Sequence, residues 1–346
     1  MPHHVKIPSR GRRFIRMGEI VKTNHILVPL ILGLSALLFI GGVIKKVHGM
    51  SEGAREKTIA VIPKGTANMW WATVSQGAAA AAREGRVKIL WTGPEMETDR
   101  ERQIQAVNDV LVRRVDAVVL GPNDYNALAR SVDAIAARGI PVIIIDSPVN
   151  TERYDAFAGT DNYQGGAAGA RRLARAVGGR GRVILTHFVQ NSASTEARAR
   201  GFKETLAQEF PEMELAAEQY TLGTVEDARQ RTTDMLTRHP DVVGVFAVNH
   251  PASVGAYKAL QGAGVAGRVK YVGFDSDPVL LDGIVRGEVE ALIVQNPYEI
   301  GYRGVQLALD RLNGKPVARQ NNVPSMEVDQ ANLETMKQRY PSALGL

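Results

Sequence analysis

The sequence predicts an α/β protein of two lobes, each an open Rossmann-like parallel sheet covered by helices, preceded by an N-terminal transmembrane or signal helix. The chain has 346 residues, enough for two ordinary domains, because single domains cluster near ~100 to 150 residues. Short β-rich runs alternate with Ala-rich helical runs from Lys57 to about Asn313, which is the pattern of parallel sheets with crossover helices. An uncharged apolar run, 26–44, precedes them.

The apolar run 26–44 is long enough to cross a membrane as a helix. At ~1.5 Å per residue it covers ~28 Å, about the thickness of a bilayer core. Six basic residues precede it and only Lys45 and Lys46 follow it closely, so we expect an N-terminus inside and the rest of the chain exported. No small-x-small pattern follows, which favours an uncleaved anchor and leaves cleavage open. Residues 1–25 then form a basic leader and residues 45–56 a linker.

The positive charge of the chain is confined to this N-terminal segment. The formal net charge is +6, but residues 1–50 hold eight basic residues against one acidic residue, and the remaining chain holds 34 against 35. A nearly neutral folded part does not attract phosphate backbones, so we expect no nucleic-acid partner. The absence of cysteine excludes disulfides, thiolate metal sites, a Cys nucleophile and a lipid-acceptor Cys.

The alternation predicts two sets of strands and helices in series. The first set has strands at 58–62, 87–91, 117–120, 142–145 and 156–159 and helices at 71–83, 102–113 and 127–138. The second has strands at 182–186, 215–220, 243–248, 271–274 and 291–294 and helices at 163–177, 196–209, 225–237, 253–261, 279–286 and 300–313. In open parallel sheets the carboxyl ends of the strands line a crevice, so two facing sheets predict a cleft between lobes.

Polar and aromatic side chains gather just beyond the predicted strand ends. They are Asn68, Trp70, Trp71, Asp124, Asp146, Asp161, Asn162, Asn249, Asp275 and Gln295, and Arg198 stands at the start of a predicted helix. Carboxylates, amides and Arg suit the hydroxyls of a sugar, and aromatic rings suit its C–H faces. The set predicts a carbohydrate cleft.

Each of these residues also has an ordinary structural interpretation. Asp161, Asn162 and Asp275 could cap the helices that follow them, and one residue of the Trp pair could belong to the core. The Gly-rich stretch 161–169 lacks both the GxGxxG order and the Walker residues, so we interpret its glycines as close helix packing. The seven histidines include no metal-like pair in the folded part. We therefore expect no catalytic residue, no metal and no cofactor.

With these residues identified, the chain resembles the periplasmic binding proteins of ribose and simple-sugar ABC importers, across nearly all of Lys57 to Val328. The motifs that carry the resemblance occur in order: Asn68-x-Trp70-Trp71, Ile140-Pro141-Val142 ending in Asp146, Gly159-Thr160-Asp161-Asn162, Arg198-x-x-Gly201-Phe202, Val248-Asn249, Gly273-Phe274-Asp275 and Gln295-x-Pro297.

The resemblance implies a role for each matching residue. Trp70 and Trp71 replace the family's aromatic pair against the sugar ring, Asn68 contacts a hydroxyl, and Phe274 adds an aromatic wall. The polar ligand positions fall on Asp146, Arg198, Asn249, Asp275 and Gln295.

Three positions depart from the ribose binders, which implies a ligand other than ribose. Gly121 stands in place of Asn, Ser147 in place of Arg and Leu222 in place of an aromatic residue, and Asp124 or His250 would compensate.

The family fold also implies three crossings between lobes, near 160, 295 and 324. An N-terminal lobe then comprises 57–160 plus 296–324, and a C-terminal lobe 161–295 plus 325–346. Ligand would shift the population toward a closed state by contacting both lobes.

The hypothesis from sequence is therefore a substrate-binding component of an ABC sugar importer, located in the periplasm or at the outer face of the cytoplasmic membrane. Its partners would be a small sugar ligand, an ABC permease in the inner membrane, and the membrane itself through 26–44. The alternative is an anchored sugar or autoinducer-like sensor that presents its ligand to a signalling receptor. A repressor-type regulator of the same fold is disfavoured, because the N-terminus holds an apolar run in place of a DNA-binding helix-turn-helix. An α/β enzyme would require a nucleophile, metal site or cofactor loop.

Overall fold

The computed structural model describes residues 55–346 and His3. The expected leader, the apolar helix 26–44 and most of the linker lie outside the described residues. Among those described, no helix combines the length and the hydropathy that crossing a bilayer requires. The fold that follows is that of residues 56–346.

The first lobe is built on a parallel sheet of six strands. Its strand order is β11-β5-β4-β3-β1-β2, and every neighbouring pair is parallel. The strands are β1 (Thr58–Ile62), β2 (Lys88–Trp91), β3 (Ala117–Leu120), β4 (Val142–Ile145), β5 (Ala156–Gly159) and β11 (Gln320–Asn322). The central strands β3 and β4 are buried throughout and wholly apolar, as expected for parallel strands covered on both faces.

The second lobe repeats this plan with one antiparallel edge. Its order is β12-β10-β9-β8-β6-β7, in which only β12 runs antiparallel to its neighbour. The strands are β6 (Gly181–Thr186), β7 (Met213–Gln219), β8 (Val242–Ala247), β9 (Lys270–Phe274), β10 (Ala291–Val294) and β12 (Met326–Val328). The predicted pair of α/β lobes is therefore confirmed, and the ten predicted strands match observed ones.

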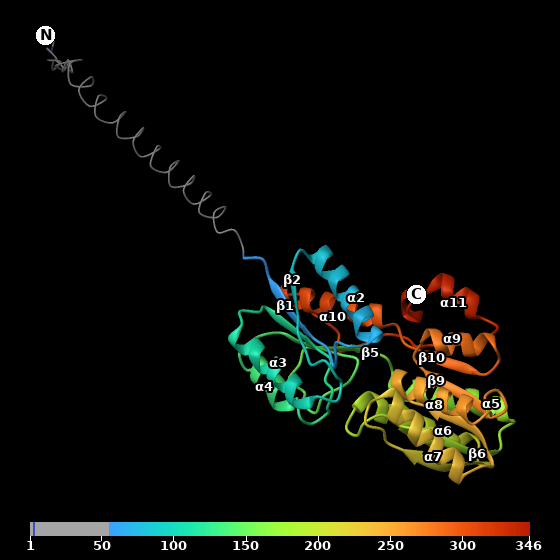
Figure 1. The fold of residues 1–346 in the computed structure, drawn as a ribbon. Helices are drawn as coiled ribbons and strands as arrows, with labels where there is room; N and C mark the ends of the chain where they lie inside the picture. The colour runs from blue at the N-terminus through green and yellow to red at the C-terminus, as the bar shows by residue number, and fades with distance from the viewer. Residues whose placement is uncertain (1–2, 4–54) are drawn as a thin grey trace. The chain divides into compact units, whose positions relative to one another are not determined.

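The helices cover both sheets. They are α2 (Met69–Gly85), α3 (Arg100–Val112), α4 (Ala129–Ala136), α5 (Asn162–Val177), α6 (Ala193–Glu209), α7 (Val225–Arg238), α8 (His250–Gly262), α9 (Pro278–Val285), α10 (Pro297–Leu312), α11 (Leu333–Arg339) and the short 3-10 turn η1 (Pro341–Leu344). Although α10 comes late in the chain, it lies beside α2 in the first lobe (Figure 1).

The chain therefore passes from one sheet to the other three times. The passages lie between β5 and β6, between β10 and β11, and between β11 and β12. The exact lobe boundaries expected from the sequence stay a prediction. The two short strands β11 and β12 were not expected, because segments of three residues with polar members carry no apolar pattern.

Glycines let the covering helices approach closely where the site is built. A Cβ at Gly166 of α5 would collide with the backbone of Arg198 in α6, and one at Gly201 of α6 would collide with the carbonyl of Tyr163. The interpretation of the Gly-rich stretch as close helix packing is thus confirmed. The close approach of α5 and α6 determines how deeply the Arg198 side chain is buried.

Candidate ligand-binding site

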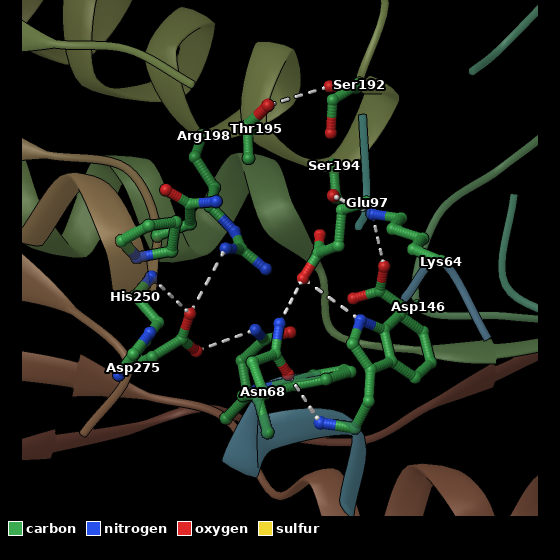
Figure 2. A pocket seen from close by; sticks show the side chains of 15 residues that line it. Lys64, Asn68, Glu97, Asp146, Ser192, Ser194, Thr195, Arg198, His250 and Asp275 are labelled. Atoms are coloured by element: carbon green, nitrogen blue, oxygen red, sulfur yellow. Dashed lines mark hydrogen bonds and ion pairs between the residues drawn. The ribbon is translucent and has the colours of Figure 1, made fainter. Parts of the chain in front are cut away.

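A cavity lies between the two lobes, at the carboxyl ends of both sheets. It is lined by Lys64, Asn68, Trp70, Trp71, Glu97, Asp146, Ser192, Ser194, Thr195, Arg198, Asn249, His250, Pro251, Asp275 and Gln295. Figure 2 shows Arg198 and His250 on one side of it and Lys64 and Asp146 on the other. The free space within it is about 30 Å³, room for about two water molecules. A ring-sized ligand therefore requires the lobes to move apart for entry.

The start of α2 forms an aromatic wall in the first lobe. Asn68 caps this helix by accepting a hydrogen bond from the Trp71 amide, with an N···O distance of 2.9 Å. The Trp71 side chain is buried, and its ring meets that of Trp70 edge to face at 4.7 Å between centroids. The Trp70 indole Nε1 is buried without a hydrogen-bond partner. One Trp thus belongs to the core, while the other keeps an unused donor at the cavity.

Glu97 ties the aromatic wall together. Its Oε1 accepts hydrogen bonds from Asn68 Nδ2 at 2.6 Å and from Trp71 Nε1 at 3.1 Å. Burial raises the pKa of the Glu97 carboxyl, and the nearby Lys64 ammonium partly counteracts this rise. A carboxylate in such surroundings requires compensation when the lobes exclude water.

Lys64 joins the two lobes. Its Nζ lies 2.5 Å from Asp146 Oδ2 and donates hydrogen bonds to Ser147 Oγ at 2.6 Å and to Ser194 Oγ at 3.1 Å. Ser147 belongs to the first lobe and Ser194 to α6 of the second, and their hydroxyls are 2.8 Å apart. The ammonium is therefore coordinated by groups that converge only when the lobes are close.

Arg198 is held entirely within the second lobe. Its side chain is only 2% exposed; Nε donates to Asn162 Oδ1 at 2.8 Å and Nη1 to the Val248 carbonyl at 3.0 Å. The guanidinium lies 3.9 Å from the centre of the Phe274 ring, a cation–π contact. Burial lowers the pKa of the Arg198 guanidinium, while the Asp275 carboxylate, 3.9 Å away, counteracts this effect. The protein itself thus holds the Arg198 guanidinium in position, without a ligand.

Two aspartates occupy matching positions in the two lobes. Asp146 follows β4 directly and Asp275 follows β9 directly, and each of these strands is third in its sheet. Both residues have left-handed backbones, with φ of 64° and 66°. Such conformations are uncommon outside glycine and cluster at functional sites. The turn that they form directs a carboxylate from each lobe toward the same cavity.

Asp275 is the centre of a polar network. It accepts hydrogen bonds from the His250 amide at 3.0 Å and from Gln295 Nε2 at 2.8 Å. Because Nε2 faces Asp275, the Gln295 Oε1 points elsewhere, and this buried atom has no hydrogen-bond partner. The network leaves an acceptor available to a ligand.

Comparison with known proteins identifies the family that has this architecture. A family model described as a periplasmic binding protein domain matches residues 59–316. The chain belongs to the periplasmic binding protein family.

Relatives in this family and their structures share most of the chain. The D-ribose/D-allose-binding protein of Pseudomonas aeruginosa is 30% identical over 77% of this chain and 85% of its own length. The ribose import binding protein of Bacillus subtilis is 25% identical, over 83% of this chain and 90% of its own.

Among solved structures, a solute-binding protein of an Agrobacterium radiobacter carbohydrate transporter, in complex with D-arabinose, superposes with a TM-score of 0.80. It has 31% identity and covers 85% of this chain and 100% of its own. One from Agrobacterium vitis with bound D-fucose gives a TM-score of 0.79 and 30% identity, with 82% and 99% covered. Family membership implies a periplasmic location and a solute-binding architecture.

The structure brings most of the residues singled out in the sequence to this periplasmic binding protein's cavity. Those that line it are Asn68, Trp70, Trp71, Asp146, Arg198, Asn249, Asp275 and Gln295.

Three others lie elsewhere. Phe274 is fully buried beneath Arg198 and supports it. Asp124 caps a turn by accepting from the amides of Asn126 and Ala127 and pairs with Arg100. Asp161 caps α5, accepting from the Gln164 amide. For Asp161 the capping interpretation describes the observed contact.

The sequence interpretation missed several lining residues. Lys64 follows β1 by two residues, so the strand-end rule could have found it. Glu97 lies six residues beyond β2, in a loop, and had no positional signal. Ser192, Ser194 and Thr195 stand at the start of α6, one turn before Arg198. His250, whose imidazole bonds to Asp277 at 2.9 Å, had been considered only as a compensating contact. No cluster of three or more metal-ligating side chains occurs among residues 55–346.

Proposed function

We propose that this protein is the substrate-binding component of an ABC-type sugar importer, and that it binds a monosaccharide-like ligand in the cavity between its lobes by hinge closure. The observation that carries the proposal is a set of unused polar atoms around one small cavity. They are Trp70 Nε1, Ser192 Oγ and Gln295 Oε1.

Unused donors and acceptors on every side favour a ligand rich in hydroxyls. A buried polar atom left without a partner is costly, and each sugar hydroxyl can donate and accept at once. The Trp70 and Trp71 rings offer apolar faces to the C–H side of such a ligand. Relatives described as binding ribose, allose, D-arabinose and D-fucose support the same class.

The location and partners follow from this role. An importer's binding component works in the periplasm and delivers its ligand to a permease in the inner membrane. We infer that the run 26–44 either anchors this chain to the outer face of that membrane or serves as its export signal. The relatives named above are described as binding or import proteins, which gives the alternative sensor role no support.

The test is ligand binding by the purified full-length chain. A thermal-shift screen covers pentoses, hexoses, deoxysugars, amino sugars and polyols, and calorimetry follows each hit, because a ligand that binds only the folded state raises the melting temperature. We expect one class of monosaccharide to raise it strongly and to bind with one-to-one stoichiometry. If no compound of the panel raises the melting temperature or binds in calorimetry, the sugar-binding role is refuted.

A further inference from the structure

The ionised groups around the cavity do not balance. Lys64 and Arg198 are the lysine and arginine of its lining, and Glu97, Asp146 and Asp275 are its carboxylates. His250 also lines the cavity, but its imidazole pairs with Asp277 at 2.9 Å. Asp146 pairs with Lys64 at 2.5 Å, and Asp275 lies 3.9 Å from Arg198. No ion pair within 4 Å joins Glu97 to any cation of residues 55–346. One carboxylate is therefore left over.

The contacts of Glu97 also leave one of its oxygens unused. Both of its hydrogen bonds end on Oε1, and both come from neutral donors, Asn68 and Trp71. No hydrogen bond or ion pair with residues 55–346 involves Oε2. Figure 2 shows the Glu97 carboxylate pointing into the middle of the cavity, between Arg198 and Asp146. A ligand there meets a charged acceptor that the protein itself does not satisfy.

We propose that the ligand of this cavity is an amino sugar, whose protonated amine pairs with Glu97 Oε2 while its hydroxyls meet the remaining polar atoms. This inference rests on the proposed sugar-binding function and narrows it. A neutral sugar could bond to Oε2, but it would leave the carboxylate charge uncompensated in a closed, dry cavity. An ammonium supplies the opposite charge, and its hydrogen bond to the carboxylate is the stronger because both partners are ionised.

The surroundings of Glu97 favour a cation as well. The Trp71 indole that bonds to Glu97 and the adjoining Trp70 ring form an aromatic corner. Ring faces attract ammonium groups, most strongly where water is excluded. The Lys64 and Arg198 cations would repel a ligand ammonium. This repulsion is weakened because Asp146 pairs with Lys64 and Asp275 lies close to Arg198. The hydroxyls of the ligand would face the donors on the opposite side, including Arg198.

The alternative is a protonated Glu97 facing a neutral ligand. Burial raises the pKa of Glu97, so the protein could relieve the unpaired charge by binding a proton. In that state Glu97 would donate to a sugar hydroxyl, and glutamine would imitate it. The substitution E97Q therefore separates the two possibilities, because it keeps the shape and both existing bonds but abolishes the charge.

The experiment compares matched ligands by calorimetry with the full-length chain. The pairs are D-glucosamine with D-glucose and D-galactosamine with D-galactose, and N-acetyl-D-glucosamine serves as the uncharged amide. We expect the amine of the better-fitting pair to bind at least about tenfold tighter than its neutral partner, since charge-assisted bonds exceed neutral ones by about that factor. E97Q should lower the affinity for the amine by about tenfold to a hundredfold and lower the affinity for the neutral sugar by less, so that the preference for the amine disappears.

Glu95 provides the matched control. It lies two residues away in the same loop with an exposed side chain outside the cavity, so E95Q makes the same chemical change and should alter no affinity. Melting temperatures of both variants verify folding. Equal or tighter binding of the neutral sugars by the unchanged protein, or an amine preference that survives E97Q, would overturn the amino-sugar proposal and leave the sugar-binding function standing. If none of these ligands nor any other sugar binds, the proposed function itself fails.

Discussion

The two walls of the cavity are built in different ways. The second-lobe wall holds Arg198 and Asp275 through partners of that same lobe, namely Asn162, Val248, Phe274 and Gln295. On the first-lobe wall, the Lys64 ammonium donates one of its hydrogen bonds to Ser194 Oγ, across the cleft. Glu97 on the same wall keeps an unused oxygen. The second-lobe wall therefore exists in any hinge position, whereas the first-lobe wall is completed only in the closed one.

This difference divides the work of recognition between the lobes. A prearranged wall loses little entropy on binding and supplies affinity. A wall completed by closure contributes to the difference between open and closed states, which is what a ligand must shift. We therefore expect substitutions in the second-lobe wall to change both stability and affinity. Those in the first-lobe wall should mainly change closure and the choice of ligand.

The largest effect is expected for Arg198→Ala. It removes a buried cation and leaves Asp275 without its ionic partner, which costs about 3–5 kcal/mol of unfolding free energy. Ligand affinity should fall at least about a hundredfold, because hydroxyls lose a charged donor in a desolvated cavity. Urea denaturation and calorimetry measure the two quantities. Arg200→Ala, an exposed change on the same helix, is the control. A variant with normal stability and affinity would show that the second-lobe wall is not prearranged around Arg198.

A smaller and more selective effect is expected for Ser194→Ala. The change deletes the hydrogen bonds that Lys64 and Ser147 make across the cleft, worth about 1–2 kcal/mol in the closed state alone. Affinity should fall by about tenfold, while the unfolding free energy without ligand changes little. Small-angle scattering at saturating ligand should still show closure. A large loss of stability instead would mean that this bridge supports the fold rather than the hinge.

A titrating pair at the edge of the second-lobe wall should make stability depend on pH. Burial lowers the pKa of His250, but the hydrogen bond that its ring donates to Asp277 and the charge of Asp275 outweigh it, so the net shift of the His250 pKa is upward from 6.5. A raised pKa means that the folded state holds the proton more tightly. The contribution is therefore complete below pH 6.5 and disappears as the pH rises through the raised value.

The variant Asp277→Asn isolates this contribution while retaining an acceptor that can cap α9. The unchanged protein should lose about 0.5–1 kcal/mol of unfolding free energy more than the variant between pH 6 and pH 8. Urea denaturation at three pH values measures the difference. Parallel pH profiles for the two proteins would contradict the assignment.

The two walls also differ in how well their residues can be predicted from the sequence. Asp275 and Gln295 follow a strand end directly and Asn249 follows one by two residues, and periodicity locates strand ends well, so these three positions could be predicted. The strand-end rule would also have predicted Lys64, which follows β1 by two residues. Glu97 could not be predicted in this way, because it is the sixth residue of the loop 92–99, which can direct a side chain anywhere. Only long-range packing against Asn68 and Trp71 brings it to the cavity. Asp124 and Asp161 satisfied the strand-end rule but found nearer partners in backbone amides.

The smallest effect is expected at Asp161, and it tests where the second-lobe wall ends. Its carboxylate accepts from the Gln164 amide at the start of α5 and is exposed to solvent. Asp161→Ala should therefore cost about 0.5–1 kcal/mol of unfolding free energy, as the loss of a helix cap does, and leave ligand affinity unchanged within about twofold. Asp161→Ser, which restores a capping oxygen without the charge, should recover most of the stability. A tenfold loss of affinity in both variants would mean that Asp161 reaches the ligand, and that the wall extends past Asn162 to the hinge.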